Sequence, residues 1–402
     1  MTMIQHSTIE QILLRTDIRS VVGEYAALQG NGVRQRCCCP FHNEKTPSFF
    51  INTVTNRWHC FGACGEGGDV ISFVMKKNGM TFQQAVRHLA NRCGVTIEEC
   101  ADNHTQEQRE TELKREALFV LYNSVQQYYE HQLLLPTAEA CQALEYAHNR
   151  WGKDLCAEQG IGYAPNSWQG LIDYARQQSL SIELMKEIGL IAVSDKTGKE
   201  YDFFRGRIMI PIRDQYGRVI GYTGRTLSED DKTPKYLNST SSPLYQKSKT
   251  IFGMDIAWRI GMKEGMFVLV EGAPDVLRLQ SIGVLNAVAS LGSDWTDDQF
   301  TLLNRSASKV LFLPDADRPK VGTSYGTGIS KVIKSACRAW ELGFEVAIKE
   351  IPLGQNGNKQ DPDSYCKSRF IYDDLETQDF PIWYADYEAL PQTPYMFDFW
   401  QY

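Results

Sequence analysis

Two pairs of metal-binding side chains near the N-terminus constrain the fold more than any other feature of the sequence. The pairs are Cys39 with His42, in the string CPFH, and Cys60 with Cys64, in the string CFGAC. Each pair fits within one turn of chain, and a strand-length spacer separates the pairs. Thiolate and imidazole groups arranged in this way can close a tetrahedral zinc site. Structural thiols in a small apolar core would not require paired spacing, so the sequence predicts a zinc-ordered module.

The choice of ligands is less constrained than the site itself. Cys37 and Cys38 adjoin Cys39, and His59 adjoins Cys60, so alternatives exist at both ends. The first residues lack the continuous apolar stretch of a signal peptide, so we do not expect the chain to be secreted. Its eleven cysteines are therefore expected to be thiols and metal ligands and not disulfides. Because four protein ligands leave no open coordination position, we expect one structural zinc ion that supplies folding energy.

Helix-capping residues and changes in composition and hydrophobic pattern divide the 402 residues into five parts. Asp69 predicts a helix cap, and Thr81 with Gln84 predicts a capping box, so the first module ends near residue 100. The predicted parts are a zinc-binding domain (1–100), a helical linker (101–135), a basic N-terminal core subdomain (136–260), a parallel-sheet subdomain (261–370) and an acidic, aromatic tail (371–402).

Buried strands and helices alternate from Met266 onward. MFVLV, LNAVAS, KVLFLPD and FEVAIKE are typical of buried strands, and their alternation with helices predicts a parallel sheet covered on both faces. Before them, RIMIPIRD and VIGYTGRTL predict two strands around the turn Tyr216-Gly217. The predicted fold class is α/β (α+β overall), with a small zinc-ribbon domain, a mixed α/β subdomain and a parallel-sheet subdomain.

Acidic side chains follow several of these strands. Glu271 follows MFVLV, Asp315 and Asp317 follow KVLFL, and Asp361 and Asp363 lie beyond FEVAIKE. Carboxyl ends of parallel strands share one edge of a sheet, so these groups can converge there. Converging carboxylates repel one another unless a divalent cation joins them, and oxygen ligands suit Mg²⁺ or Mn²⁺. A loop preference explains a single Asp, but three acidic motifs in this order predict a site for metal-assisted phosphoryl transfer.

Two segments of the chain resemble the DnaG-type primases. The run CPFHNEKTPSFFINTVTNRWHCFGACGEGGDVISF is similar to the zinc-binding domain of that family, and the acidic motifs resemble its Toprim fold, which topoisomerases and some nucleases share. There are two departures. Ala63 makes the last cysteine pair C-x3-C instead of C-x2-C, and Arg318-Pro319-Lys320 replaces the usual Arg-Ala-Gly, which leaves the start of the next helix open.

The resemblance implies roles for individual residues. Three acidic residues match the central, magnesium-binding catalytic positions, namely Glu271, Asp315 and Asp317. Three more match the additional acidic positions of the primases, namely Asp275, Asp361 and Asp363. The residues that match strings preceding the Toprim fold, and that we expect to hold template and nucleotide, are Arg205, Arg207, Arg225, Lys235, Asn238 and Lys247. A solvated surface is the alternative for any one of the basic side chains.

The family's zinc-binding domain is implicated in recognising single-stranded template. Candidate phosphate contacts in this chain are Arg34, Lys45 and Arg57, and candidate base-stacking residues are Trp58, Phe49 and Phe61. Packing around the metal is the alternative for the aromatic side chains.

The resemblance implies a DNA primase that joins ribonucleoside triphosphates on single-stranded DNA. The net charge of −7 opposes nucleic-acid binding, but the segment between Arg205 and Arg259 is locally basic. No segment is long and apolar enough to span a bilayer, so we expect a cytoplasmic protein without a membrane partner.

Two other functions compete with this interpretation. One is a Toprim nuclease or topoisomerase, although a type IA topoisomerase needs a nucleophilic tyrosine in a further domain. The other is a non-catalytic, DNA-binding replication accessory protein. A replicative helicase is a candidate partner, but residues 371–402 are too few for the helicase-binding domain of cellular primases, which is compatible with a phage or mobile-element origin.

Overall fold

The computed structural model divides the chain into two compact units. The first comprises Met1–Pro211 and Tyr216–Leu244, and the second comprises Ile212–Gln215 and Tyr245–Tyr402. The structure describes residues 3–370 except 5, 98, 101–105, 229, 231–232, 293, 319–326, 350, 352 and 355–356. The tail predicted over 371–402 lies outside the described residues. Within the described ranges, no helix is both long and apolar enough to cross a membrane.

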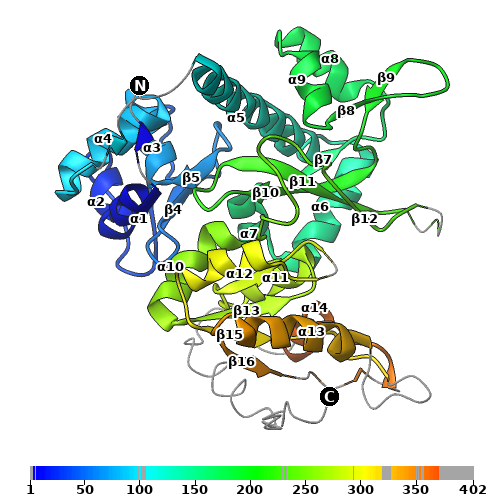
Figure 1. The fold of residues 1–402 in the computed structure, drawn as a ribbon. Coiled ribbons are helices and arrows are strands. Elements are labelled where there is room, and N and C mark those ends of the chain that lie inside the picture. The colour runs from blue at the N-terminus through cyan, green and yellow to red at the C-terminus, as the bar shows by residue number, and fades with distance from the viewer. Residues whose placement is uncertain are drawn as a thin grey trace. The chain divides into compact units, whose positions relative to one another are not determined.

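The N-terminal part of the first unit is a four-stranded antiparallel sheet with helices beside it (Figure 1). Its strands follow chain order, and they are β2 (Arg34–Cys37), β3 (Phe49–Asn52), β4 (Arg57–Cys60) and β5 (Gly67–Asp69). The other elements are α1 (His6–Arg15), α2 (Ile18–Val22), α3 (Val70–Asn78), α4 (Phe82–Cys93), and β1 (Met3–Ile4) paired with β6 (Glu99–Cys100). Asp69 caps α3, and Thr81 with Gln84 forms the capping box of α4, as predicted.

The remainder of the first unit packs a long helix, α5 (Gln106–Leu133), against β7 and β11 of a second antiparallel sheet. The strand order is β12-β11-β10-β7, with β7 (Gly162–Ala164), β10 (Arg207–Arg213), β11 (Val219–Thr226) and β12 (Tyr236–Asn238). Around it lie α6 (Ala138–Trp151), α7 (Lys153–Gln159), α8 (Gly170–Gln177), α9 (Ile182–Glu187), β8 (Ile191–Val193) and β9 (Glu200–Asp202). Strands β10 and β11 confirm the two predicted from the sequence. The predicted linker is helical in α5, and from Leu118 onward this helix contributes side chains to the core.

The second unit contains the predicted parallel sheet, in the order β14-β13-β15-β16. Its strands are β13 (Met266–Val270), β14 (Ala287–Ala289), β15 (Lys309–Phe312) and β16 (Glu345–Ile348). Its helices are α10 (Met254–Glu264), α11 (Ala273–Ser281), α12 (Asp297–Asn304), α13 (Thr327–Glu341) and α14 (Pro362–Phe370). Helix α10 packs on β13 and β14, and the longer stretch of the second unit begins at Tyr245.

The strand order of this sheet creates a switch point between β13 and β15. From β13 the chain moves to β14 on one side, and then returns past β13 to β15 on the other side. Connections that leave neighbouring strands in opposite directions open a crevice beyond their carboxyl ends, where ligands bind in α/β proteins. The order of the strands therefore marks the ends of β13 and β15 as the candidate binding edge.

Candidate active site and zinc centre

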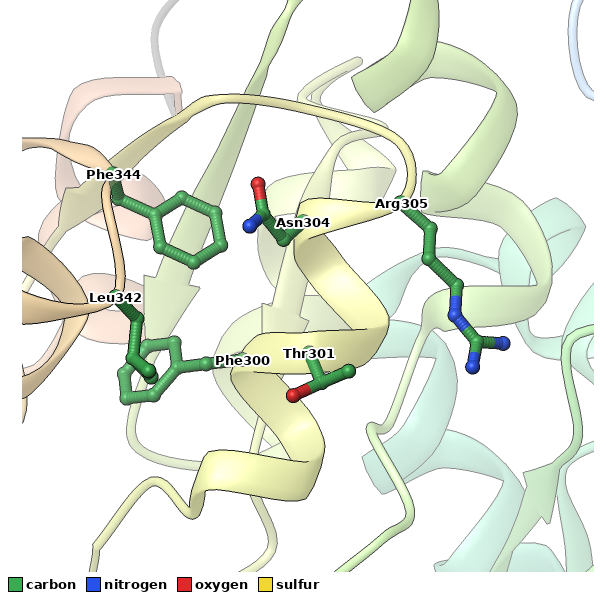
Figure 2. A pocket seen from close by; sticks show the side chains of 6 residues that line it. All are labelled: Phe300, Thr301, Asn304, Arg305, Leu342 and Phe344. Carbon is green, nitrogen blue, oxygen red and sulfur yellow. The ribbon is translucent and has the colours of Figure 1, made fainter.

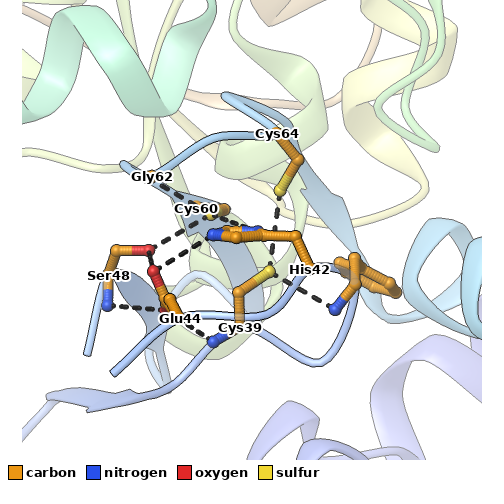
Figure 3. Close-up of polar contacts among 8 residues, drawn as sticks. Cys39, His42, Glu44, Ser48, Cys60, Gly62 and Cys64 are labelled. Atoms are coloured by element: carbon orange, nitrogen blue, oxygen red, sulfur yellow. Dashed lines mark hydrogen bonds and ion pairs between the residues drawn. The ribbon is translucent and has the colours of Figure 1, made fainter. Parts of the chain in front are cut away.

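The four predicted zinc ligands come together at one end of the N-terminal sheet (Figure 3). Cys39 and His42 lie between β2 and β3, Cys60 ends β4, and Cys64 lies between β4 and β5. Their ligand atoms all lie within 4.8 Å of one another. The Sγ atoms of Cys39 and Cys64 are 3.6 Å apart, and Cys60 Sγ is 3.9 Å from His42 Nδ1. Zinc bonds of about 2.3 Å to sulfur and about 2.0 Å to nitrogen give tetrahedral edges of roughly 3.5–3.8 Å, so the spacing fits zinc.

The surroundings of the sulfur atoms also fit a cation. The Phe41 N–H donates to Cys39 Sγ at 3.4 Å, and the Gly62 N–H donates to Cys60 Sγ at 3.3 Å. Burial is the main cause that raises the pKa of the Cys39 and Cys64 thiols above the ordinary value. A bound cation favours the thiolate and so offsets this cost. The C-x3-C spacing does not prevent Cys64 from reaching the cluster.

The alternative ligands lie outside this cluster. Cys38 is exposed. Cys37 is buried, and burial, followed by the neighbouring thiols, raises its pKa to about 12. His59 is buried in β4, and its ring centroid lies 4.6 Å from that of Phe61. The geometry therefore distinguishes the four clustered residues from the neighbouring Cys and His residues, which the sequence alone leaves as alternative zinc ligands.

The aromatic side chains of the zinc-binding part mostly form its core. Trp58 and Phe49 stack with centroids 5.1 Å apart and are at most 3% exposed. The Trp58 Nε1–H donates to the Asp69 carbonyl at 2.9 Å. A ring without an exposed face cannot stack on a nucleobase, so the base-stacking role expected for Trp58 and Phe49 is wrong. Phe61 is only half-buried and stays a candidate.

The arginines expected to contact phosphate here have protein partners. Arg34 forms ion pairs with Asp154 and Glu158 of α7. Arg57 is 7% exposed. Both side chains serve packing within the first unit, whereas Lys45 is exposed and stays a candidate phosphate contact.

Two acidic residues lie at the switch point of the parallel sheet. Glu271 directly follows β13, and Asp315 follows β15 after two residues. Leu269 pairs with Phe312 in the register of these strands, so both carboxylates leave the sheet at nearly the same level. Glu271 Oε1 and Asp315 Oδ1 are buried and accept no hydrogen bond from the residues that the structure describes. Buried carboxylate oxygens without donors are costly, and a divalent cation at this edge would satisfy them.

Burial and mutual repulsion act on these carboxylates. Burial, followed by the charge of Asp315, raises the pKa of Glu271. Burial also raises the pKa of Asp315, although Lys359 partly offsets it. Lys359 Nζ lies 2.7 Å from Asp315 Oδ2 and 3.4 Å from Asp317 Oδ1, and Lys331 Nζ lies 3.9 Å from Glu271 Oε2. In the part of the chain that the structure describes, the carboxylates therefore gather around ammonium groups and do not form a closed ligand cage.

The D-P-D motif approaches the same edge through a backbone bridge. The Ala316 N–H donates to the Gln360 carbonyl at 2.7 Å, and the reverse bond is 3.0 Å. Asp275, in the first turn of α11, is buried, and its pKa is raised well above the ordinary value. The causes, after burial, are the negative charges of Asp315, Asp361 and Asp363. The electrostatics thus place all three acidic motifs in one neighbourhood.

Asp361 and Asp363 also have structural contacts. Asp361 Oδ1 accepts from the Ser364 N–H at 2.7 Å at the start of α14. Asp363 Oδ1 accepts from Arg278 Nε at 3.0 Å, which ties α14 to α11. These contacts favour a supporting role for both residues, which hold the ends of two helices at the acidic edge.

Two of the predicted template-binding arginines lie against aromatic rings of the first unit. The guanidinium carbon of Arg205 is 4.0 Å from the ring centroid of Trp168, which is 61% exposed. That of Arg225 is 4.5 Å from the ring centroid of Tyr146, and Arg225 also donates to the Tyr236 hydroxyl at 3.3 Å. An arginine that is held over an aromatic ring keeps its charge and can still contact phosphate.

The other residues of this set differ in their exposure. Arg207 is 5% exposed, and it donates to the Gly224 and Pro234 carbonyl oxygens at 2.9 Å each. Its geometry favours a structural role. Lys235 is exposed near β12, and Lys247 is exposed in the second unit. Asn238, the last residue of β12, is half-buried.

A hollow of about 240 Å³ in the second unit is distinct from the acidic edge (Figure 2). It is lined by Phe300, Thr301, Asn304, Arg305, Leu342 and Phe344. These residues precede β15 or β16, so they lie at the amino ends of the strands, whereas the carboxylates follow the carboxyl ends. The hollow therefore lies away from the candidate binding edge.

The motifs of the sequence do not identify Lys359 and Arg278, which pair with acidic residues of this edge. Lys359 stands two positions before the D-P-D motif, and Arg278 stands three positions after Asp275. Proximity to acidic motifs was the available signal, but spacing alone does not show which cations meet which carboxylates.

A zinc ribbon, followed by a parallel sheet with carboxylates at its switch point, defines a zinc-binding protein with a Toprim-type catalytic unit. Family models match in the same order: a CHC2 zinc finger at residues 4–105, the N-terminal domain of the DNA primase catalytic core at 128–258, and a Toprim-like domain at 268–366. The chain belongs to the DnaG-type primase family.

Individual relatives agree with this assignment. The chain is 34% identical over 365 residues to the DNA primase of Halalkalibacterium halodurans and 32% identical to that of Staphylococcus epidermidis, in each case over 90% of its length. It spans 57% and 58% of those relatives. The zinc-binding and RNA polymerase domains of Aquifex aeolicus primase match with 32% identity and a TM-score of 0.63, over 90% of this chain and 83% of that one. A DnaG primase catalytic domain bound to single-stranded DNA matches with 28% identity and a TM-score of 0.54, over 69% and 81%.

Proposed function

We propose that this chain synthesises RNA primers, joining ribonucleoside triphosphates on single-stranded DNA with release of pyrophosphate. The observation that carries the proposal is the pair Glu271 and Asp315 at the switch point of the parallel sheet. Each has one buried oxygen that accepts no hydrogen bond from the described part of the chain. The zinc cluster in the same chain distinguishes this arrangement from a Toprim unit alone.

The acidic edge supplies what nucleotidyl transfer requires. Mg²⁺ or Mn²⁺ bound there would favour the ionised 3′-hydroxyl and neutralise negative charge on the triphosphate. Glu271, Asp315 and Asp317 would hold the metal. Asp275 and Asp363 would shape the edge from α11 and α14. Lys359 lies where it can balance the carboxylate charge before the metal arrives.

The basic residues of the core would hold template and nucleotide. Arg205 and Arg225 lie on aromatic rings, and Lys235 and Lys247 are exposed, so their charges can reach phosphate groups. The proposed partners are single-stranded DNA and ribonucleoside triphosphates, and a replicative helicase is a further proposed partner. The solved relative bound to single-stranded DNA supports the choice of template.

A primer-synthesis assay tests this function. The chain is incubated with single-stranded DNA, labelled ribonucleoside triphosphates and either Mg²⁺ or Mn²⁺, and the products are separated by size. We expect labelled oligoribonucleotides that depend on template and on metal. Shortened DNA without labelled product would instead indicate a nuclease, and DNA binding with neither product would indicate an accessory protein.

Substitutions of Lys235 and Arg207 are expected to change different properties, namely template binding for Lys235 and stability for Arg207. Lys235→Ala removes an exposed charge, so it should weaken binding to single-stranded DNA and reduce the slope of log affinity against log salt by roughly 0.7, with an unchanged melting temperature. Arg207→Ala removes a buried hydrogen bond to the Gly224 carbonyl and a partly buried one to the Pro234 carbonyl, so it should lower the free energy of unfolding by roughly 1–3 kcal/mol. Fluorescence anisotropy and urea unfolding measure the two effects, and equal loss of stability in both variants would contradict this division.

Lys359→Gln is expected to change metal binding. Removal of the ammonium group leaves the carboxylates of Asp315 and Asp317 without their counterion, so Mn²⁺ should bind several-fold more tightly while the metal-free protein melts at a lower temperature. Paramagnetic resonance of free Mn²⁺ measures the affinity. Lys334→Gln, on the exposed side of α13, is the matched control, and an unchanged or weaker affinity in Lys359→Gln would refute the counterion role.

A further inference from the structure

Glu44 lies beside the zinc cluster and contacts it through both oxygens of its carboxylate (Figure 3). Glu44 Oε1 accepts from the Cys39 N–H at 2.6 Å and from the Ser48 N–H at 3.1 Å. Glu44 Oε2 accepts from the Ser48 hydroxyl at 2.6 Å and lies 3.1 Å from His42 Nε2. The carboxylate therefore contacts the backbone of one ligand and the side chain of another.

The Glu44 contact determines which nitrogen of His42 faces the metal. Nε2 is directed at Glu44, whereas Nδ1 lies 3.9 Å from Cys60 Sγ, inside the cluster. A carboxylate can only accept a hydrogen bond, so the Glu44 contact requires the proton on Nε2. Nδ1 then carries the free lone pair that a metal needs. Carboxylates that hold a metal-bound histidine in this way fix its tautomer and orient its ring.

Ser48 and Gly62 complete the network around this carboxylate. The Ser48 hydroxyl oxygen lies 3.4 Å from Cys60 Sγ, so it connects Glu44 with a third ligand. A Cβ atom at Gly62 would clash with the Ser48 hydroxyl and would lie 3.0 Å from both Glu44 Oε2 and His42 Nε2. The loop that contains the additional residue of the C-x3-C pair thus passes directly over the network and requires a glycine there.

We infer that Glu44 is a positioning residue of the zinc centre, which holds His42 for coordination through Nδ1 and ties the Cys39 and Ser48 segments together. The inference rests on the geometry of the cluster and does not depend on primer synthesis. It gives a structural role to Glu44, which is not itself one of the four zinc ligands.

The first test uses the unmodified chain loaded with zinc and labelled with ¹⁵N. Long-range ¹H–¹⁵N correlation spectra report which ring nitrogen of His42 carries the proton and which is bound to metal. We expect a protonated Nε2 and a metal-bound Nδ1. Coordination through Nε2 would overturn the inference whatever the variants show.

The second test measures zinc retention in Glu44→Gln. Glutamine keeps the size of the side chain but has only one acceptor oxygen, so it cannot serve both the backbone pair and the His42 side. We expect zinc transfer to a chromogenic chelator to become about 10- to 100-fold more favourable. Ser48→Ala, which keeps the carboxylate, should have a smaller effect in the same direction.

Glu66→Gln is the matched control for this test. Glu66 belongs to the same part of the chain and forms an ion pair with Lys76, so its replacement also removes one negative charge. Its zinc retention should equal that of the unmodified chain. Equal retention in Glu44→Gln and Glu66→Gln, at full zinc loading of both, would show that Glu44 does not position the ligands.

Discussion

Asp315→Asn is expected to abolish primer synthesis while the protein remains folded. The substitution keeps the shape of the side chain but removes a negative charge that is next to Glu271 at the switch point. Charge stabilisation by a catalytic metal is worth several kcal/mol, and each 1.4 kcal/mol is a factor of ten, so we expect a loss of about a thousandfold or more. The rate of labelled oligoribonucleotide formation at saturating metal measures the effect. Glu271→Gln should behave in the same way.

The stability of these variants is part of the prediction. Burial and repulsion raise the pKa of Asp315 in the metal-free chain, which means that the ionised carboxylate is costly there. The neutral amide removes this cost, so the melting temperature without metal should not fall. Asp298→Asn, at an exposed position in the first turn of α12, is the control with unchanged synthesis. Full synthesis by Asp315→Asn would refute the assignment of the acidic edge as the catalytic site.

Cys60→Ser is expected to release zinc and to unfold the N-terminal ribbon. Structural zinc binds zinc-finger peptides with roughly 10–16 kcal/mol of apparent free energy, and this energy is available for folding. A serine oxygen is a poor zinc ligand compared with a thiolate, so the site loses one of its four bonds. Atomic emission should show about one zinc ion per unmodified chain and far less in the variant.

The neighbouring cysteines provide a matched control for this loss. Cys38→Ser changes an exposed thiol one residue away from Cys39 and outside the cluster, so zinc content and the melting profile should be unchanged. Circular dichroism should show the loss of ordered ribbon in Cys60→Ser alone. Stoichiometric zinc in Cys60→Ser would show that another residue completes the site.

Features that depend on short segments of chain could be predicted from the sequence. The caps at Asp69 and Thr81 involve backbone groups only three residues away, so their spacing is enough to identify them. Strands β13 and β15 stand out as apolar runs, and the residues that follow them are known once the strands are known. The spacing within the pair Cys39 and His42, and within the pair Cys60 and Cys64, similarly predicts a metal site, because each pair is local.

Features that depend on packing between distant segments could not be predicted. Trp58 and Arg207 have the side chains of nucleic-acid-binding residues, yet both are buried. The burial of a side chain on a strand depends on which other elements pack over that strand, and no local sequence pattern indicates which elements these are. The position of Lys359 beside Asp315 likewise depends on a backbone bridge between segments more than forty residues apart.

The sequence by itself determined that this chain has a zinc module, a parallel-sheet unit and acidic residues at strand ends, because hydrophobic periodicity and ligand spacing are local properties. Only the tertiary structure decided that β13 lies beside β15, so that Glu271 and Asp315 share a switch point. The tertiary structure also places Glu44 against Nε2 of His42, so that Nδ1 is the nitrogen inside the cluster. Both results come from contacts between separate segments, whose geometry is fixed only when the whole fold excludes the other arrangements.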